Sequence, residues 1–495
     1  MSDEIQDLHP SLPRPSGLSR RNFMESVTGG FYAAALGSIL RQEVSADEAL
    51  ESSTESEHAF DLEQRPTHIR PRAKSVIHLF MHGGPSQMDL FDPKSALDRL
   101  HGKSYFDKIA GEVENVEAAG AILRSPFKFA RHGRCGAWVS EVMPHLAGCV
   151  DDIAFIRSMY TTNLTHEPAL RIIHSGRMLP GLPTIGSWVS YGLGTVNQNL
   201  PGYVVLDDPL GLPINKHQNW QCGFLPPVYQ GTRFRATGSP VLNLERQFVE
   251  PDEITQLERD LIGRVDRRHL LARPGQNRLD ARISSYELAA RMQLEASDAL
   301  DLRQESPQTL EAYGVGKGST DSYGRRCLIA RRLVERGVRF VQLFINSQIW
   351  DTHYSHDPQI RKASERTDQP VAALLKDLKQ RGLLDETLVV WGGEFGRLPI
   401  AQVQNEDLSR AGRDHNKNAM CSWMAGGGVR GGVTHGSTDE LGLKAAENPV
   451  SVPDFHATIL HLLGLDHERV TFHRHGFPER LTGTNEVRII EDILA

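Results

Sequence analysis

Continuous apolar runs, rather than alternating ones, mark the strands that this sequence predicts. Such runs are typical of strands that helices cover on both faces, because neither face then meets water. Turn residues and polar segments separate the runs along the chain. The predicted strands are Ser75–His82, Ile153–Met159, Gly202–Leu206, Val338–Ile345, Thr387–Gly393 and Cys421–Gly427.

Helical patterns lie between these runs. Ser284–Asp301 is amphipathic, and Arg366–Arg381 leads directly into the next predicted strand. The segment Ser451-Val452-Pro453-Asp454 has the pattern of a capping box and predicts a helix that continues through Leu463. Strands that alternate with helices indicate a three-layer α/β fold, with a mostly parallel central sheet flanked by helices.

The N-terminal segment has the order basic, apolar, small that an export signal requires. Arg20-Arg21 precede the apolar run Val27–Leu40, which is short for a bilayer span, and Val44-Ser45-Ala46 suits a signal peptidase. Paired arginines before such a run resemble a twin-arginine signal, which exports folded proteins; the alternative is a chance Arg-Arg pair before a buried helix. We predict a signal peptide over 1–46, a linker over 47–72 and one domain over 73–495. The mature chain is then periplasmic or extracellular, without an integral membrane span.

Composition narrows the class of protein only slightly. The 495 residues are 39% hydrophobic and 24% charged, with a formal net charge of -7, which is ordinary for a globular protein. The sequence has no basic block, so we do not expect nucleic acid as a partner. The five cysteines are far apart and form no C-x-x-C pair, which favours buried thiols over disulfides or a zinc knuckle.

Ionisable side chains stand next to the predicted strands at one end. In an open α/β sheet, ligands bind outside the carboxyl ends of the strands. Separate segments therefore deliver His, Asp or Glu to one edge, although each segment alone is also explained as a surface group or a helix cap. The residues are His82, Asp89 and Asp92; Thr161, Thr162, Thr165, His166 and Glu167; Asp351, His353 and His356; Glu394 and Arg397; and Arg413, Asp414, His415 and Lys417.

The mixture of imidazoles and carboxylates points to a divalent metal, and it favours zinc, manganese or iron over calcium. Asp351 and His353 cannot share one face of a helix, but on a loop they can converge on a metal. Arginines nearby are natural clamps for sulfate, phosphate or carboxylate oxygens. The glycines around Glu394 and Arg397 allow a sharp turn. Such a turn directs Glu394 at a metal and Arg397 at an anion. The alternative is an ion pair between the two that closes a tight turn.

A set of motifs gives the chain a family resemblance. "HGGPSQMDLFDPK", "WDTH", "GGEFGR", "GRDH", "GGGVRGG…TDELG" and "HATILHLLGLDHER" together resemble the exported, sulfatase-like proteins catalogued as a domain of unknown function. The resemblance covers the chain from Lys74 to the C-terminus, and the twin-arginine leader also matches. This family is distant kin of the alkaline phosphatase and sulfatase superfamily. The resemblance implies a central sheet with one or two metals at its carboxyl edge, and transfer of phosphoryl or sulfuryl groups through a nucleophile at a helix N-terminus.

The superfamily pattern transfers to this sequence only in part. Its first strand usually ends in a metal-binding aspartate, whereas this chain has His82 there and Asp89 a turn later. The superfamily has an Asp-His pair after its fourth or fifth strand, and this chain has Gly393-Glu394 in that place. Asp351, His353 and His415 stand where the superfamily places its other ligands, with a shorter Asp/His spacing. The predicted metal ligands are His82, Asp89, His166, Asp351, His353, Glu394 and His415.

The largest departure concerns the nucleophile. "HEPALRIIHSG" matches the length of the superfamily helix, but His166 stands in the nucleophile's place and Thr165 is one residue away. Three interpretations remain: His166 is a metal ligand, Thr165 is the nucleophile, or the protein binds without cleaving. The predicted catalytic residues are Thr165, His166, Arg397 and Arg413.

Two functions follow from these residues. The first is a metal-dependent hydrolase of sulfate or phosphate monoesters, in which arginines stabilise the developing charge. The second is a non-catalytic exported protein that binds anionic glycans or a protein partner. In either case the expected ligand is a small anionic ester or a sulfated or phosphorylated glycan. The sequence does not determine the oligomeric state.

Overall fold

The continuous apolar runs form the central sheet of the computed structural model, which describes residues 62–105, 110–235, 251–273, 277–345, 348–403 and 410–495. Every predicted strand is present, and the sheet has nine strands in all. In spatial order they are β13 (Val433–His435), β5 (Ile153–Tyr160), β12 (Met420–Ala425), β9 (Thr387–Gly392), β1 (Ser75–Phe80), β8 (Phe340–Phe344), β6 (Tyr203–Leu206) and β7 (Thr232–Phe234), with β16 (Val450–Ser451) also paired to β5.

The direction of the strands decides which residues meet at one edge. β1 pairs in parallel with β8 and with β9, and every residue of these three strands is buried. β12 runs antiparallel to both β9 and β5, so β5 points the same way as β9. The carboxyl ends of β1, β5, β8 and β9 therefore share one edge, where β12 begins. The predicted mostly parallel sheet is confirmed, with β12 as an antiparallel member.

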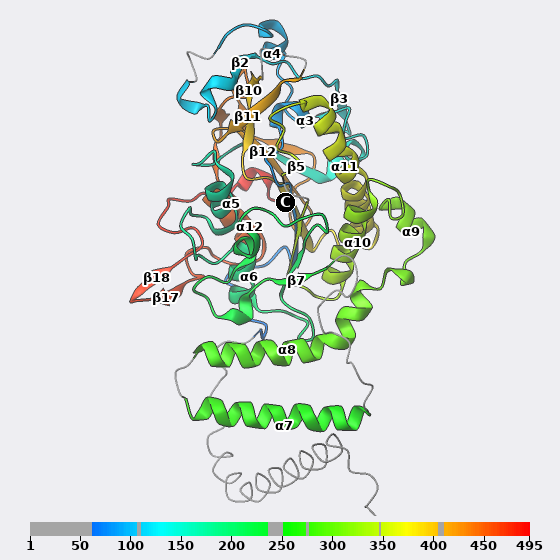
Figure 1. Cartoon of the computed structure of the whole chain (residues 1–495), viewed down its shortest axis with the longest axis vertical. Helices are drawn as coiled ribbons and strands as arrows, with labels where there is room; N and C mark the ends of the chain where they lie inside the picture. The colour runs from blue at the N-terminus through cyan, green and yellow to red at the C-terminus, as the bar shows by residue number, and fades with distance from the viewer. Residues whose placement is uncertain (1–61, 106–109, 236–250, 274–276, 346–347, 404–409) are drawn as a thin grey trace, which may run out of the picture. The chain divides into compact units, whose positions relative to one another are not determined.

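Helices cover the sheet on both sides (Figure 1). α5 (His166–Ser175), α6 (Ile185–Leu193) and α12 (Val452–Leu462) lie on one side, whereas α10 (Asp321–Glu335) and α11 (His356–Gln380) lie on the other. Ser451 and Asp454 form the predicted capping box at the start of α12. The three-layer α/β prediction is confirmed. Among the described residues, the other α-helices are α3 (Gln87–Leu90), α4 (Ser95–Leu100), α7 (Asp252–Leu271), α8 (Asn277–Leu300) and α9 (Pro307–Ala312).

A smaller antiparallel sheet stands beyond the carboxyl edge of the main sheet, at the top of Figure 1. Its order is β11 (Gly412–Asn416), β10 (Gly396–Gln402) and β2 (Ala119–Ile122). Because β10 directly follows the loop after β9, and β11 directly precedes β12, this sheet closes over the edge where the candidate residues gather. Three hairpins complete the strands: β3 (Phe129–His132) with β4 (Ala137–Ser140), β14 (Ser437–Thr438) with β15 (Ala445–Glu447), and β17 (Phe472–Arg474) with β18 (Phe477–Glu479).

Short 3₁₀ helices occupy several connections between these elements. Two of them, η3 and η4, flank the residues that contact β11 of the small sheet. They are η3 (Ala110–Glu112), η4 (Val116–Ala118), η5 (Leu146–Asp152), η6 (Lys216–Trp220), η7 (Pro227–Tyr229), η8 (Leu302–Gln304) and η10 (Glu491–Ile493).

The predicted signal peptide and most of the predicted linker lie outside the described residues. The end of that predicted linker packs on the domain, because Leu62 is buried in the core. Thr195 N–H donates to the Leu62 carbonyl at 2.8 Å, and His68 N–H donates to Gly464 O at 2.8 Å. No helix in the described ranges combines the length and the apolar character needed to cross a bilayer.

Candidate metal centre

Four of the predicted residues come together at the carboxyl edge of the sheet. His166 is the first residue of α5, Asp351 and His353 lie in the loop between β8 and α11, and His415 lies in β11. Each offers one ligand atom, and these atoms all lie within 4.8 Å of one another. His166 and His415 are buried, whereas Asp351 and His353 are partly open to solvent. The cluster is therefore largely enclosed by protein, with solvent exposure at Asp351 and His353.

The spacing of these atoms fits a small coordination sphere. Asp351 Oδ1 lies 2.9 Å from His353 Nε2 and 3.2 Å from His415 Nε2, and Asp351 Oδ2 lies 3.2 Å from His166 Nε2. Ligands about 2.0 to 2.2 Å from a tetrahedral zinc ion are separated by about 3.3 Å. The Nε2 atoms of His353 and His415 are only 3.0 Å apart, so their two lone pairs can face each other only with a proton or a metal between them. Three imidazoles and one carboxylate are a suitable donor set for such an ion.

A hydrogen-bond acceptor faces the far nitrogen of each imidazole. His166 Nδ1 lies 2.7 Å from Glu394 Oε1, His353 Nδ1 contacts Gln402 Oε1, and His415 Nδ1 lies 2.6 Å from Glu114 Oε2. Carboxylate and amide oxygens only accept, so Nδ1 of His166 and Nδ1 of His353 carry the proton and donate it, whereas the contact of His415 Nδ1 with Glu114 is an ion-pair contact without hydrogen-bond geometry. The Nε2 lone pairs of His166 and His353 are then left for the cluster. Metal-ligating histidines are commonly oriented in this way.

Glu394 and His82 lie behind His166 rather than beside Asp351. Glu394 is fully buried and accepts from Gly83 N–H at 3.0 Å as well as from His166. His82 Nδ1 accepts the Gln348 N–H at 3.1 Å, so in the neutral ring Nε2 carries the proton and faces Glu394 Oε1 at 3.9 Å. His82, His166 and Glu394 offer ligand atoms within 4.8 Å of one another, but a protonated Nε2 of His82 has no lone pair for a metal in that form. The structure thus places Glu394 as the acceptor for His166, and His82 behind Glu394.

The charges of the cluster are tightly coupled. Burial alone would lower the pKa of His166, but its hydrogen bonds to Asp351 and Glu394 raise that pKa to about 9. Burial opposes ionisation of Asp351, yet the Arg397 guanidinium and the neighbouring histidines hold its pKa well below the ordinary range. Burial lowers the pKa of His82, which keeps that ring neutral. A metal must therefore displace a proton from His166, and metal affinity should fall as the pH falls.

Arg397 holds Asp351 in place and has no donor directed at solvent. Its Nη2 donates to Asp351 Oδ1 at 2.7 Å, and its other N–H groups donate to Gly84 O at 2.9 Å and Arg413 O at 3.0 Å. The Gly83 backbone has φ of 114°, and a Cβ there would lie 2.5 Å from Asp351 N, so a side chain would displace the loop that carries Asp351. Arg397, which was predicted to bind an anion, is therefore fully buried and instead holds Asp351.

Asp89 and Arg413 pair with each other away from the cluster. Arg413 Nε lies 2.7 Å from Asp89 Oδ2 and Arg413 Nη2 lies 3.2 Å from Asp89 Oδ1, while His356 Nε2 lies 2.8 Å from Asp89 Oδ2. Both members of the pair are buried, and Arg413 also donates to the Leu398 carbonyl at 3.3 Å. The structure therefore does not bring Asp89 to the predicted metal set, and it does not direct Arg413 at a substrate.

Thr165 stands at the N-terminus of α5, next to His166. It is the N-cap residue, its side chain is exposed, and its hydroxyl does not cap the helix. The first turn of α5 therefore keeps backbone N–H groups without a side-chain acceptor from its cap residue, beside the cluster. Such a helix end favours anions, because its N–H groups and dipole both attract negative charge.

Two residues that contact the cluster were not predicted from the sequence. Glu114 precedes η4 in a polar segment that follows no predicted strand. Gln402 ends β10, a strand that contains Pro399, and proline is unusual inside a strand because it lacks the N–H of a ladder hydrogen bond. Neither residue carries a local signal, because each reaches its histidine through strand pairing or loop docking between distant parts of the chain.

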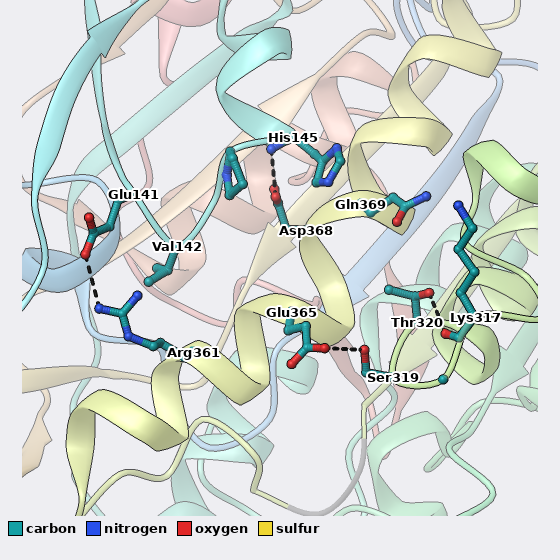
Figure 2. Close-up of a pocket in the computed structure, with 12 residues that line it drawn as sticks. Glu141, Val142, His145, Lys317, Ser319, Thr320, Arg361, Glu365, Asp368 and Gln369 are labelled. Atoms are coloured by element: carbon teal, nitrogen blue, oxygen red, sulfur yellow. Dashed lines mark hydrogen bonds and ion pairs between the residues drawn. The ribbon is translucent and has the colours of Figure 1, made fainter.

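A separate cavity of about 650 Å³ contains none of the predicted site residues (Figure 2). Its charged side chains are engaged with the protein: Arg361 Nη2 lies 3.1 Å from Glu141 Oε1, and Ser319 Oγ donates to Glu365 at 2.8 Å. Buried Asp368 accepts the His145 and Leu146 N–H groups, each at 2.7 Å. These contacts account for the polar groups of the cavity without a ligand.

The fold and the site together define a mixed α/β protein with a His/Asp cluster, suited to a metal, at the carboxyl edge of its sheet. The chain belongs to the family described as Protein of unknown function (DUF1501), whose model matches residues 73–494. Among curated proteins, no sequence matches this chain.

Several solved structures match this chain at low sequence identity and low TM-scores. The lipoteichoic acid synthase LtaP from Listeria monocytogenes matches with a TM-score of 0.37 and 10% identity, over 86% of this chain and 79% of that chain. The PsFucS1 sulfatase from Pseudoalteromonas sp. matches with a TM-score of 0.34 and 12% identity, over 81% and 69%. Alkaline phosphatase from the Antarctic bacterium TAB5 matches with a TM-score of 0.30 and 12% identity, over 72% and 92%. Values this low transfer no activity, substrate or residue role to this chain.

Proposed function

We propose that this protein is a metal-dependent hydrolase of sulfate or phosphate monoesters, with its metal held by His166, His353, His415 and Asp351. The observation that carries the proposal is the convergence of three Nε2 atoms on one carboxylate at the N-terminus of α5. A divalent metal bound there supplies a Lewis acid that attracts charge from an ester oxygen. Zinc, manganese and iron all suit this donor set.

Other residues of the chain orient the metal ligands and bind the anionic ester. Glu394 and Gln402 orient His166 and His353, and Arg397 fixes Asp351. The first backbone N–H groups of α5 bind the anionic oxygens of the ester, beside the cluster. Because Arg397 and Arg413 are occupied by protein partners, this helix end takes the anion-binding role that was predicted for the arginines.

Variants at the start of α5 separate a metal ligand from a nucleophile. We expect His166→Ala to lose metal and turnover together, because it removes one of the converging Nε2 atoms. We expect Thr165→Ala to keep the metal, because this exposed side chain supplies no atom to the cluster. Metal content by elemental analysis and hydrolysis of aryl sulfate and aryl phosphate are the measurements.

The outcomes assign the attacking group. Loss of turnover in metal-loaded Thr165→Ala assigns attack to the Thr165 hydroxyl, whereas unchanged turnover assigns it to water. A His166→Ala protein that keeps its full metal content contradicts the proposed ligand set.

One observation favours the alternative, a non-catalytic protein that binds anionic glycans or a protein partner. Neither predicted arginine has a guanidinium group available to stabilise the transition state of an ester. The metal-loaded wild type decides between the two functions. Absence of turnover for any aryl sulfate or phosphate, with sulfated glycans still bound in a titration, supports the binding protein and rejects the hydrolase.

We also propose that the protein is exported by the twin-arginine route to the periplasm or beyond. The support is the sequence Arg20-Arg21 ahead of an apolar run and a small-residue cleavage site. Changing both arginines to lysine is expected to retain the precursor in the cytoplasm, because the paired arginines mark this route. Cell fractionation measures the result, with Arg41→Lys as the control, and unchanged export of the double variant contradicts the proposal.

A further inference from the structure

The acceptors behind the three histidines differ in how they are held. Glu394 and Gln402 are buried at the ends of strands of the fold, with exposed fractions of 0% and 4%. Glu114 instead comes from the segment between η3 and η4, and its side chain is 35% exposed. The cluster therefore depends on a surface segment for the acceptor that faces His415.

Asp414 anchors this segment by its backbone. Its Oδ2 accepts the N–H groups of Glu114 and Asn115, each at 3.0 Å, and its Oδ1 accepts the His415 N–H at 2.8 Å. Asp414 is almost fully buried, so its carboxylate is committed to these backbone donors. Glu114, Asp414 and His415 also lie close enough to suggest a second metal site, but the backbone contacts of Asp414 account for the arrangement without one.

A second contact holds the same segment from its other end. Glu112 Oε2 accepts from the Asn418 side chain at 2.9 Å and lies 3.3 Å from Lys417 Nζ. Asp414, Lys417 and Asn418 all belong to the stretch that follows β10 and contains His415. The segment is thus docked on the immediate neighbours of one ligand.

We propose that Glu114 is a positioning residue that fixes the tautomer of His415, and that Asp414 docks the segment that carries it. A neutral imidazole has one N–H group, and a carboxylate oxygen 2.6 Å from Nδ1 favours the proton on that nitrogen, which leaves the Nε2 lone pair for the cluster. Without that acceptor the proton can move to Nε2, and His415 is lost as a ligand in that form. This inference rests on the proposed metal centre.

The contact at His353 indicates whether Glu114 is needed for its charge or only for its acceptor oxygen. Gln402 faces His353 Nδ1 with a neutral amide oxygen, so an uncharged acceptor is sufficient in this site. Glu114→Gln keeps an acceptor and removes the charge, whereas Glu114→Ala removes both. Glu117→Ala, in the adjoining η4 and exposed, is the matched control.

Zinc affinity, measured by competition with a chelator on the purified protein, tests the proposal. We expect Glu114→Ala to weaken zinc binding by about 10- to 100-fold, the usual effect of losing a partner of a ligating histidine. Glu114→Gln and Glu117→Ala should bind as wild type does. Wild-type affinity in Glu114→Ala overturns the inference, and so does a Glu114→Gln protein as weak as Glu114→Ala, because charge would then be the requirement.

Hydrogen exchange of the wild-type protein gives a second test that needs no variant. If the docked segment helps His415 bind zinc, then zinc must by linkage stabilise the docked segment. The amides of Glu114 and Asn115, which donate to Asp414, should exchange more slowly with zinc than without it. Equal exchange overturns the inference while leaving the metal centre intact, whereas a wild type that binds no zinc, manganese or iron overturns the proposed function and the inference together.

Discussion

Replacing Asp351 with asparagine is expected to reduce metal affinity more than any other conservative change in this chain, by more than about 100-fold, because it alters a ligand rather than one of its partners. Asp351 supplies the one carboxylate of the cluster and lies within 3.2 Å of all three Nε2 atoms. Asparagine keeps the shape and a carbonyl oxygen for Arg397, but it removes the charge that offsets the cation. Metal content after purification and a chelator competition are the measurements.

Asp357→Asn is the matched control for that variant. Asp357 lies in the first turn of α11, close in sequence, and pairs with Arg361 at 2.6 Å on the surface. Its replacement should leave metal binding unchanged. Full metal content in Asp351→Asn contradicts the proposed centre, and a loss of thermal stabilisation by added metal in that variant alone supports it, since only bound metal stabilises the fold by mass action.

The largest loss of stability is expected from Asp89→Ala. This change leaves the Arg413 guanidinium buried without its carboxylate, and it also removes the partner of His356 Nε2. Breaking a buried ion pair by removing one partner typically costs about 3–5 kcal/mol. The midpoint of urea unfolding should therefore shift strongly to lower concentration, whereas the exposed Asp98→Ala on α4 should change it little.

The same variant separates the two roles that Asp89 has been given. If Asp89 supports the small sheet through Arg413, folded Asp89→Ala at low temperature still binds one full equivalent of the metal that wild type binds. Loss of that metal from protein that remains folded, by circular dichroism, contradicts the structural role and restores Asp89 to the predicted ligand set.

Much of the framework was predictable because it depends on local pattern. Runs such as Val338–Ile345 are apolar throughout, which requires cover on both faces, and that requirement leads to a three-layer fold. Once parallel strands are expected, the residues after their ends must lie at one edge. His166, Asp351 and His353 were predicted to meet for this reason. His415 precedes its strand and reaches the same edge because β12 is antiparallel, and the structure brings all four residues within reach of one another.

The roles of individual side chains were less predictable, because they depend on which partner each side chain finds. Arg397 follows Glu394 in sequence, yet it pairs with Asp351 from another loop. His82 ends the first predicted strand as a ligand would, but a backbone N–H from Gln348 determines its tautomer. Nothing local to Arg397 or His82 indicates these contacts.

The sequence by itself therefore determined the strands, the layers and the edge at which the ionisable residues gather, since apolar periodicity and strand direction are properties of the chain. The tertiary structure alone decided which of those residues face one another. It placed Glu394 behind His166, paired Asp89 with Arg413 and brought Glu114 to His415. The physical reason is that a tautomer or an ion pair is fixed by the partner within about 3 Å, and folding supplies that partner from distant parts of the chain.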